Sequence, residues 1–176
     1  MTIDYNIVGV IAGFASVVVA MVALWLESKK TRLTTQADIL LRLDERFCCS
    51  EMRTLRGNAS GKLLAGKLPN NELGDILDFF SNLAYMVNRG ALDMELVYAP
   101  FEYWITGYWC AAQGYISKQR QFDPESWLTL ENLIKRMELM KKSTEAHLSD
   151  ESLRAFLEEE AQYGRSDFAN HSTGLL

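Results

Sequence analysis

The sequence contains few of the residues that enzymes use most often for catalysis or metal binding. Its 176 residues include two histidines and three cysteines. His147 and His171 lie in the C-terminal part, no Glu-x-x-His pair occurs, and no His/Cys cluster has the spacing of a metal site. A nucleophile elbow, a phosphate-binding loop and a dinucleotide fingerprint are also absent. We therefore predict that the chain is not an enzyme and uses neither a metal nor a cofactor.

The cysteines also lack the spacing of a disulfide framework. Cys48 and Cys49 are adjacent, and Cys110 stands alone. An odd, unevenly spaced set argues against a disulfide-stapled secreted domain. We expect three reduced thiols in or near the core.

Charge is absent from Ile7 to Leu26. As a helix this stretch would be about 30 Å long, which matches the hydrocarbon thickness of a bilayer. Tyr5 and Trp25 stand where aromatic side chains prefer the membrane interface. A cleaved signal peptide would need basic residues before the run, and a buried core helix would need a larger domain around it. We predict a short external segment over residues 1–6 and a transmembrane helix over residues 7–26.

The orientation of this predicted span follows from the basic residues beside it. Lys29, Lys30 and Arg32 follow the apolar run directly, and no Lys or Arg precedes it. Basic residues favour the cytoplasmic side. We therefore predict a single-pass protein of the bacterial inner membrane, with its N-terminus outside and residues 27–176 in the cytoplasm.

Small side chains recur along the predicted span at helical spacing. They are Gly9, Ala12, Gly13, Ser16 and Ala20, of which the two glycines form a GxxxG motif. Such a strip lets two membrane helices approach closely. Because glycine is common in membrane helices, a span that associates with nothing remains the alternative.

Proline and glycine are both missing between residues 13 and 57. The helix is therefore predicted to continue from residue 6 to residue 48, with residues 27–48 as a juxtamembrane stalk. Within this stretch, four apolar residues recur every seven positions. They are Leu26, Leu33, Leu40 and Phe47, and they fit either a short coiled coil or packing onto the chain's own helices.

The remaining chain shows only helical patterns, which predict an all-α fold. We expect a cytoplasmic helical domain over residues 49–163 and a flexible tail over residues 164–176. Its helices should cover residues 50–66, residues 71–90 with Gly90 closing the helix, and a stretch capped by Asp93. Two more should begin at Pro124, capped by Asp123, and after Ser149.

The segment over residues 97–116 is rich in aromatic side chains. Its apolar stripe at helical spacing predicts a central core helix that Pro100 kinks or restarts, and contact with the membrane surface is the alternative. Gly107, Ala111 and Gly114 form a narrow strip that would admit another backbone. By contrast, the acidic run Glu158–Glu160 is expected to be a solvated face.

The charges form a gradient along the chain. Residues 27–67 carry nine basic and five acidic side chains, whereas residues 150–176 carry two basic and six acidic ones. A basic membrane-proximal part fits anionic lipid, and an overall net charge of −5 does not fit nucleic-acid binding.

One stretch resembles a known family. The segment "LDFFSNLAYMVNRGALDMELVY", followed by a tryptophan-containing aromatic helix, is similar to an uncharacterised bacterial family of short membrane-anchored helical proteins, domain of unknown function 4760. The matching residues are Phe79, Phe80, Arg89, Gly90, Leu92, Asp93, Val97, Phe101 and Trp109, with Tyr115, Ile116, Arg120, Trp127 and Leu133 after them. The resemblance covers residues 7–140 approximately and implies a membrane helix and a cytoplasmic helical domain. It implies no catalytic residue.

Three functions are compatible with these observations. The leading hypothesis is a membrane-tethered helical module that recruits or regulates a membrane or cytoplasmic protein partner. The alternative is an oligomerising effector that alters membrane permeability, based on the Gly9/Gly13 face. The third is a membrane-bound enzyme with an unrecognised acidic site. The predicted partners are the lipid bilayer and either a second copy of the chain or another protein.

Overall fold

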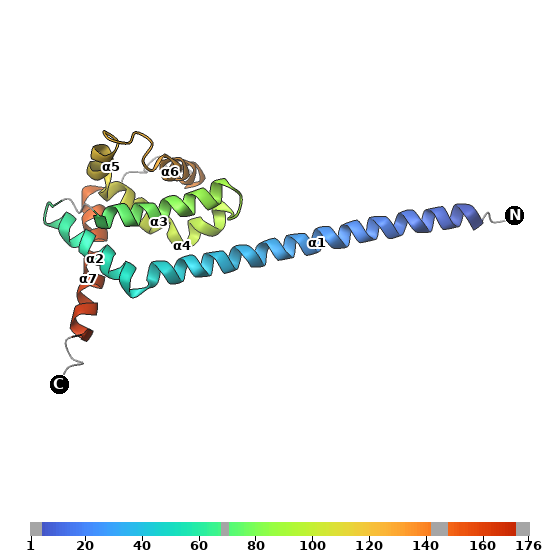
Figure 1. The fold of residues 1–176 in the computed structure, drawn as a ribbon, viewed down its shortest axis with the longest axis horizontal. Coiled ribbons are helices and arrows are strands. Elements are labelled where there is room, and N and C mark those ends of the chain that lie inside the picture. Colours follow the sequence, from blue (N-terminus) through green and yellow to red (C-terminus); the bar gives the residue numbers. More distant parts are fainter. Residues whose placement is uncertain (1–4, 68–70, 142–147, 172–176) are drawn as a thin grey trace. The chain divides into compact units, whose positions relative to one another are not determined.

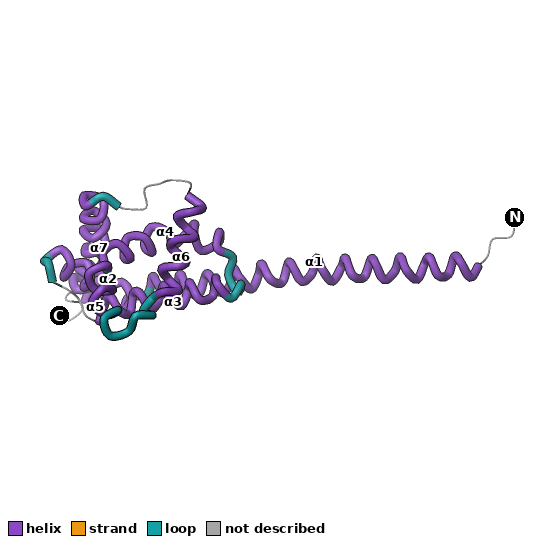
Figure 2. The backbone as a smooth tube through the Cα atoms, turned by 90° about the horizontal axis from the view of Figure 1, so that it is seen from above, coloured by secondary structure: helices purple, strands orange, loops and turns teal. Residues whose placement is uncertain are grey.

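The computed structural model describes the backbone of residues 5–67, 71–141 and 148–171, and the side chains of residues 16–67, 71–140 and 148–162. Over this backbone the chain forms seven helices and no strand. Figure 2 shows helices joined by loops. The predicted all-α class is confirmed. The chain divides into two compact units, Met1–Ile39 and Leu40–Leu176.

Helix α1 spans Tyr5–Cys48 without a break (Figure 1). This confirms the single long helix that the lack of proline and glycine predicts. Three threonines along it donate their hydroxyls to carbonyl oxygens four residues earlier, for example Thr31 Oγ1 to Glu27 O at 2.9 Å. These polar side chains therefore bond within the helix. Its division into span and stalk stays a prediction.

The predicted span falls partly outside the residues with described side chains. Residues 7–15 lie outside them. Within residues 16–67, 71–140 and 148–162, no helix combines the length and the apolarity that crossing a membrane requires.

The four residues spaced by sevens do not share one environment. Leu26 and Leu33 are exposed, whereas Phe47 is fully buried in the second unit. The end of α1 therefore packs onto the chain's own helices, and the coiled coil stays a prediction for the remainder.

Helices α2 (Ser50–Leu64) and α3 (Asn71–Asn88) follow, close to the predicted bounds. The buried face of α3 consists of Leu73, Ile76, Leu77, Phe79, Phe80, Leu83, Ala84 and Val87. Gly90 has a φ of 70° and donates its N–H to the carbonyl of Val87. It terminates the helix as predicted, because glycine adopts this left-handed conformation without a steric penalty.

The aromatic segment forms two helices rather than one. Helix α4 spans Met94–Ala111, and helix α5 spans Gln113–Gln119, with Ala112 between them. Asp93 is the N-cap residue of α4 by position. Pro100 lies inside α4 and does not restart it. Most of the predicted apolar stripe is buried, which confirms the core role of this segment. The buried residues are Val97, Phe101, Ile105, Tyr108, Ala112 and Ile116, while Trp104, Trp109 and Tyr115 are half-buried.

Helix α6 (Leu128–Lys141) begins later than the sequence predicts. Asp123 does accept hydrogen bonds, from the N–H of Glu125 at 3.2 Å and from the hydroxyl of Ser126 at 2.9 Å. These bonds hold a separate turn, which ends at Trp127 with a φ of 57°. A residue in this left-handed conformation cannot continue a right-handed helix, so the prediction of a helix starting at Pro124 is wrong.

Helix α7 spans Asp150–His171. The hydroxyl of Ser149 accepts the N–H of Ser152 at 3.2 Å, which confirms the predicted cap. The helix runs past Gly164, where we predicted the start of the tail. Residues 172–176 lie outside the described residues.

Candidate functional site

A buried ion pair joins helices α2 and α7. Arg56 Nε lies 2.7 Å from Glu160 Oε2, and Arg56 Nη2 lies 3.0 Å from Glu160 Oε1. The two side chains are 5% and 1% exposed. A guanidinium and a carboxylate that are joined by two parallel hydrogen bonds form a strong ion pair with a defined geometry.

Two aromatic donors from α4 complete the surroundings of the carboxylate. The indole N–H of Trp104 donates to Glu160 Oε1 at 3.0 Å, and the hydroxyl of Tyr108 donates to Oε2 at 2.5 Å. Each carboxylate oxygen thus accepts two hydrogen bonds, which is the number that its two lone pairs ordinarily accept. A buried carboxylate is tolerated when its charge is paired and its oxygens are satisfied in this way.

The guanidinium of Arg56 is itself held in place by Phe47 of α1. Arg56 Nη1 donates to the carbonyl oxygen of Phe47 at 3.1 Å, and its guanidinium carbon lies 4.0 Å from the centre of the Phe47 ring. That ring is surrounded by the aromatic core, with centroid distances of 5.1–5.7 Å to Phe79, Phe80, Phe101 and Trp104. These contacts orient the guanidinium toward Glu160.

Tyr108 is fully buried, and its surroundings favour the protonated phenol. Burial raises the pKa of Tyr108 well above its ordinary value of 10.0, and the negative charge of Glu160 raises this pKa further. The hydroxyl therefore remains a hydrogen-bond donor to the carboxylate throughout the neutral pH range.

A second contact fixes α7 against α4 one helical turn away. The ring of Phe156 lies over Gly107, where an added Cβ would come within 2.5 Å of the ring. The same ring makes edge contacts with Tyr103 and Tyr108 at centroid distances of 5.3 and 5.1 Å. The small-residue strip of α4 thus receives an aromatic side chain at Gly107, where the sequence predicted a backbone.

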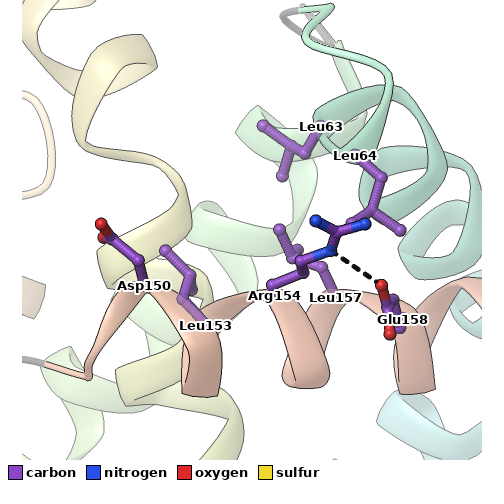
Figure 3. A pocket seen from close by; sticks show the side chains of 7 residues that line it. All are labelled: Leu63, Leu64, Asp150, Leu153, Arg154, Leu157 and Glu158. Atoms are coloured by element: carbon purple, nitrogen blue, oxygen red, sulfur yellow. Dashed lines mark hydrogen bonds and ion pairs between the residues drawn. The ribbon is translucent and has the colours of Figure 1, made fainter.

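A surface groove runs between the end of α2 and the start of α7 (Figure 3). It has a volume of about 510 Å³. The lining residues are Leu63 and Leu64 of α2 and Asp150, Leu153, Arg154, Leu157 and Glu158 of α7. Arg154 and Glu158 form an exposed ion pair at 2.9 Å. Since both helices contribute walls, this groove depends on the docking of α7.

The residues singled out from the sequence belong to the other unit. Ser16, Ala20, Trp25, Lys29, Lys30 and Arg32 are exposed on α1. The ammonium group of Lys29 lies 4.0 Å from the centre of the Trp25 ring. Tyr5, Gly9, Ala12 and Gly13 belong to the α1 backbone, but their side chains lie outside the described residues.

Sequence reasoning missed both Arg56 and Glu160. The prediction that Glu158–Glu160 is a solvated face is wrong at Glu160, although Glu158 and Glu159 are exposed. The signal was present in the spacing, because Phe156, Leu157, Glu160 and Ala161 fall on one helical face and all four are buried. Glu160 occupies a core position on that face.

Over residues 16–67, 71–140 and 148–162, no group of three or more His, Cys, Asp or Glu side chains is placed to hold a metal ion. The side chains of His147 and His171 lie outside these ranges. Cys48, Cys49 and Cys110 are half-buried free thiols, as expected, and burial raises the pKa of Cys110.

Comparison with known proteins gives one match. No curated protein and no solved structure matches the chain significantly. One family model matches residues 10–137, which include Phe47, Arg56, Trp104 and Tyr108 but not α7. The chain therefore belongs to the family described as domain of unknown function DUF4760.

Proposed function

We propose that this chain is a single-pass, membrane-tethered helical module that recruits or regulates a protein partner at the bacterial inner membrane. Residues 7–26 would cross the bilayer with the N-terminus outside. Residues 27–48 would form the stalk and the following helices the cytoplasmic interaction domain.

The exposed apolar side chains of α1 carry this proposal. Eight large apolar side chains between residues 17 and 26 are each 50–68% exposed. They are Val17, Val18, Val19, Met21, Val22, Leu24, Trp25 and Leu26. Successive helical residues point about 100° apart, so these side chains, together with the exposed Ala20 and Ala23 between them, surround the helix. Apolar surface on every side of a helix is typical of a segment that contacts lipid.

The residues after this stretch support the orientation. Trp25 and Lys29 form a cation–π contact, and Lys30 and Arg32 follow on the same helix. An interfacial tryptophan followed by a basic cluster is typical of the cytoplasmic end of a membrane helix.

The state of Glu160 supports an interaction role over the enzyme alternative. Its two oxygens already accept four hydrogen bonds from Arg56, Trp104 and Tyr108. A carboxylate bonded in this way holds helices together and is not available to accept a proton from a substrate.

The test of the tether is alkaline extraction of membranes from cells that make the full chain. We expect the chain to remain with the membrane pellet, and a control chain without residues 1–26 to appear in the soluble fraction. A C-terminal fluorescent-protein fusion should be bright, while a C-terminal alkaline phosphatase fusion should be inactive. Recovery of the full chain in the alkaline supernatant would contradict the proposal.

The native mass of the detergent-extracted complex tests the interaction role. A second protein species in the complex is the expected result. A homomultimer alone would instead favour the permeability effector, and Gly9→Leu with Gly13→Leu should then abolish the assembly.

A further inference from the structure

The donors around Glu160 form a carboxylate-binding site that lies within the family match. Arg56 comes from α2, while Trp104 and Tyr108 come from α4. All three lie within the family match over residues 10–137, and the carboxylate comes from α7, which lies beyond it. The site and its occupant are therefore separate parts of the chain.

The occupant is recognised at two positions one helical turn apart. Phe156 fills the space over Gly107, and Glu160 enters the donor cluster. Side chains four residues apart project from the same face of a helix. The surface of α2 and α4 thus contacts α7 through an aromatic residue that stands four positions before a glutamate.

The charges of α2 and α7 are complementary, whereas α4 carries Glu95 and Glu102 and no basic side chain. Helix α2 carries three basic side chains and one acidic side chain, whereas residues 150–162 carry five acidic side chains and one basic one. In addition, the hydroxyl of Tyr103 donates to Glu159 at 2.7 Å at the margin of the contact. Complementary charge directs the approach of a partner and disfavours helices of the wrong sign.

We propose that α2 and α4 form a receiving site for an acidic amphipathic helix with an aromatic residue four positions before a glutamate, and that α7 is the occupant supplied by the chain itself. A partner helix with the same two side chains competes with α7. When α7 leaves, the groove that it forms with α2 disappears, so the occupied and released states present different surfaces. This proposal rests on the interaction role proposed above for its biological meaning.

The binding test uses a fluorescent synthetic peptide of residues 148–171 and the full chain in detergent micelles. The unmodified chain should bind the peptide weakly, because α7 already fills the site. The variant Phe156→Ala with Glu160→Gln should bind it roughly tenfold more tightly or better, since its own α7 no longer competes well. A peptide in which glutamine replaces the glutamate at position 160 should lose this gain.

The matched control is Glu158→Gln, which alters an exposed carboxylate on the same helix. It should bind the peptide as the unmodified chain does. The proposal is overturned if the Phe156/Glu160 variant unfolds cooperatively, as a folded chain does, yet binds no peptide. It is also overturned if the control variant binds equally tightly.

Hydrogen exchange of the unmodified chain gives an independent test that needs no variant. A displaceable α7 should exchange its amides through local opening, faster than the buried face of α3. Equal protection of α7 and α3 would show that α7 opens only when the whole domain unfolds, and would overturn the proposal. Because the peptide and exchange experiments do not depend on membrane insertion, their failure is distinguishable from failure of the tether.

Discussion

The start of α1 and helix α3 are both rich in apolar residues, but they place these residues differently. In α3 the apolar side chains lie on one face and are buried, while Asp75, Asp78 and Asn82 face solvent. Between residues 17 and 26 of α1, the apolar side chains surround the helix and are exposed. Helix α3 therefore has the pattern of a helix between protein and water, whereas the pattern of residues 17–26 is the one on which the proposed membrane span rests.

The largest expected effect concerns this difference directly. Val18→Arg with Val19→Arg places two charges near the middle of the predicted span, at a cost of about 5–7 kcal/mol together for insertion. We expect the variant to leave the alkali-resistant membrane fraction. Asn82→Arg on the solvent face of α3 should leave the distribution unchanged. A double variant that stays in the membrane would remove the distinction between the two helices.

The next largest effect concerns the buried pair of the helical domain. Arg56→Ala leaves the Glu160 carboxylate buried without its counter-charge, so we expect a loss of about 3–5 kcal/mol in the free energy of unfolding. The exposed pair on α7 is the control, and Arg154→Ala should cost less than about 1 kcal/mol. Denaturant unfolding measures both. Equal losses would mean that burial does not determine the strength of these two pairs.

Alanine substitutions at two glycines compare a buried position with an exposed one. Gly107→Ala forces a methyl group against the ring of Phe156, and we expect a loss of about 1–3 kcal/mol. At Gly61 in α2, an added Cβ meets nothing within 4 Å. Gly61→Ala should therefore raise the free energy of unfolding by about 0.5–1 kcal/mol. The same sign for both substitutions would contradict the close contact at Gly107.

The smallest effect is the contribution of Tyr108 to the pH dependence of the free energy of unfolding. Because its pKa is raised in the folded chain, the folded state keeps the phenolic proton at a pH where the unfolded state loses it. This contribution is fully present below about pH 10, the unfolded value, and is lost as the pH rises above it. The free energy of unfolding of Tyr108→Phe should decline less steeply than that of the unmodified chain between about pH 9.5 and pH 11, on either side of that ordinary value. Parallel declines would show that Tyr108 does not ionise on unfolding.

Local signals predicted much of the fold. The helical period of α3 and the glycine at residue 90 identified both its buried face and its end, because each depends on neighbouring residues alone. The uninterrupted α1 followed from the lack of proline and glycine. The start of α6 was missed because Asp123 can cap either a helix or an isolated turn, and the left-handed Trp127 decides between them.

The candidate site depended on contacts that local patterns do not contain. Arg56 and Glu160 are 104 positions apart in the sequence. The three consecutive glutamates Glu158–Glu160 have the same chemistry. Only the docking of α7 against α2 and α4 buries the third, Glu160. The spacing of Phe156, Leu157 and Ala161 could have indicated the face, but not its partner.

Residue type and short-range periodicity were enough to identify the helical class, the apolar character of α1 and the family. The tertiary structure alone decided that one glutamate of an acidic run is buried, that an arginine and two aromatic donors receive it, and that Gly107 accepts a phenylalanine ring. The physical reason is that burial and hydrogen bonding are properties of surfaces in contact. Here those surfaces come from distant parts of the chain.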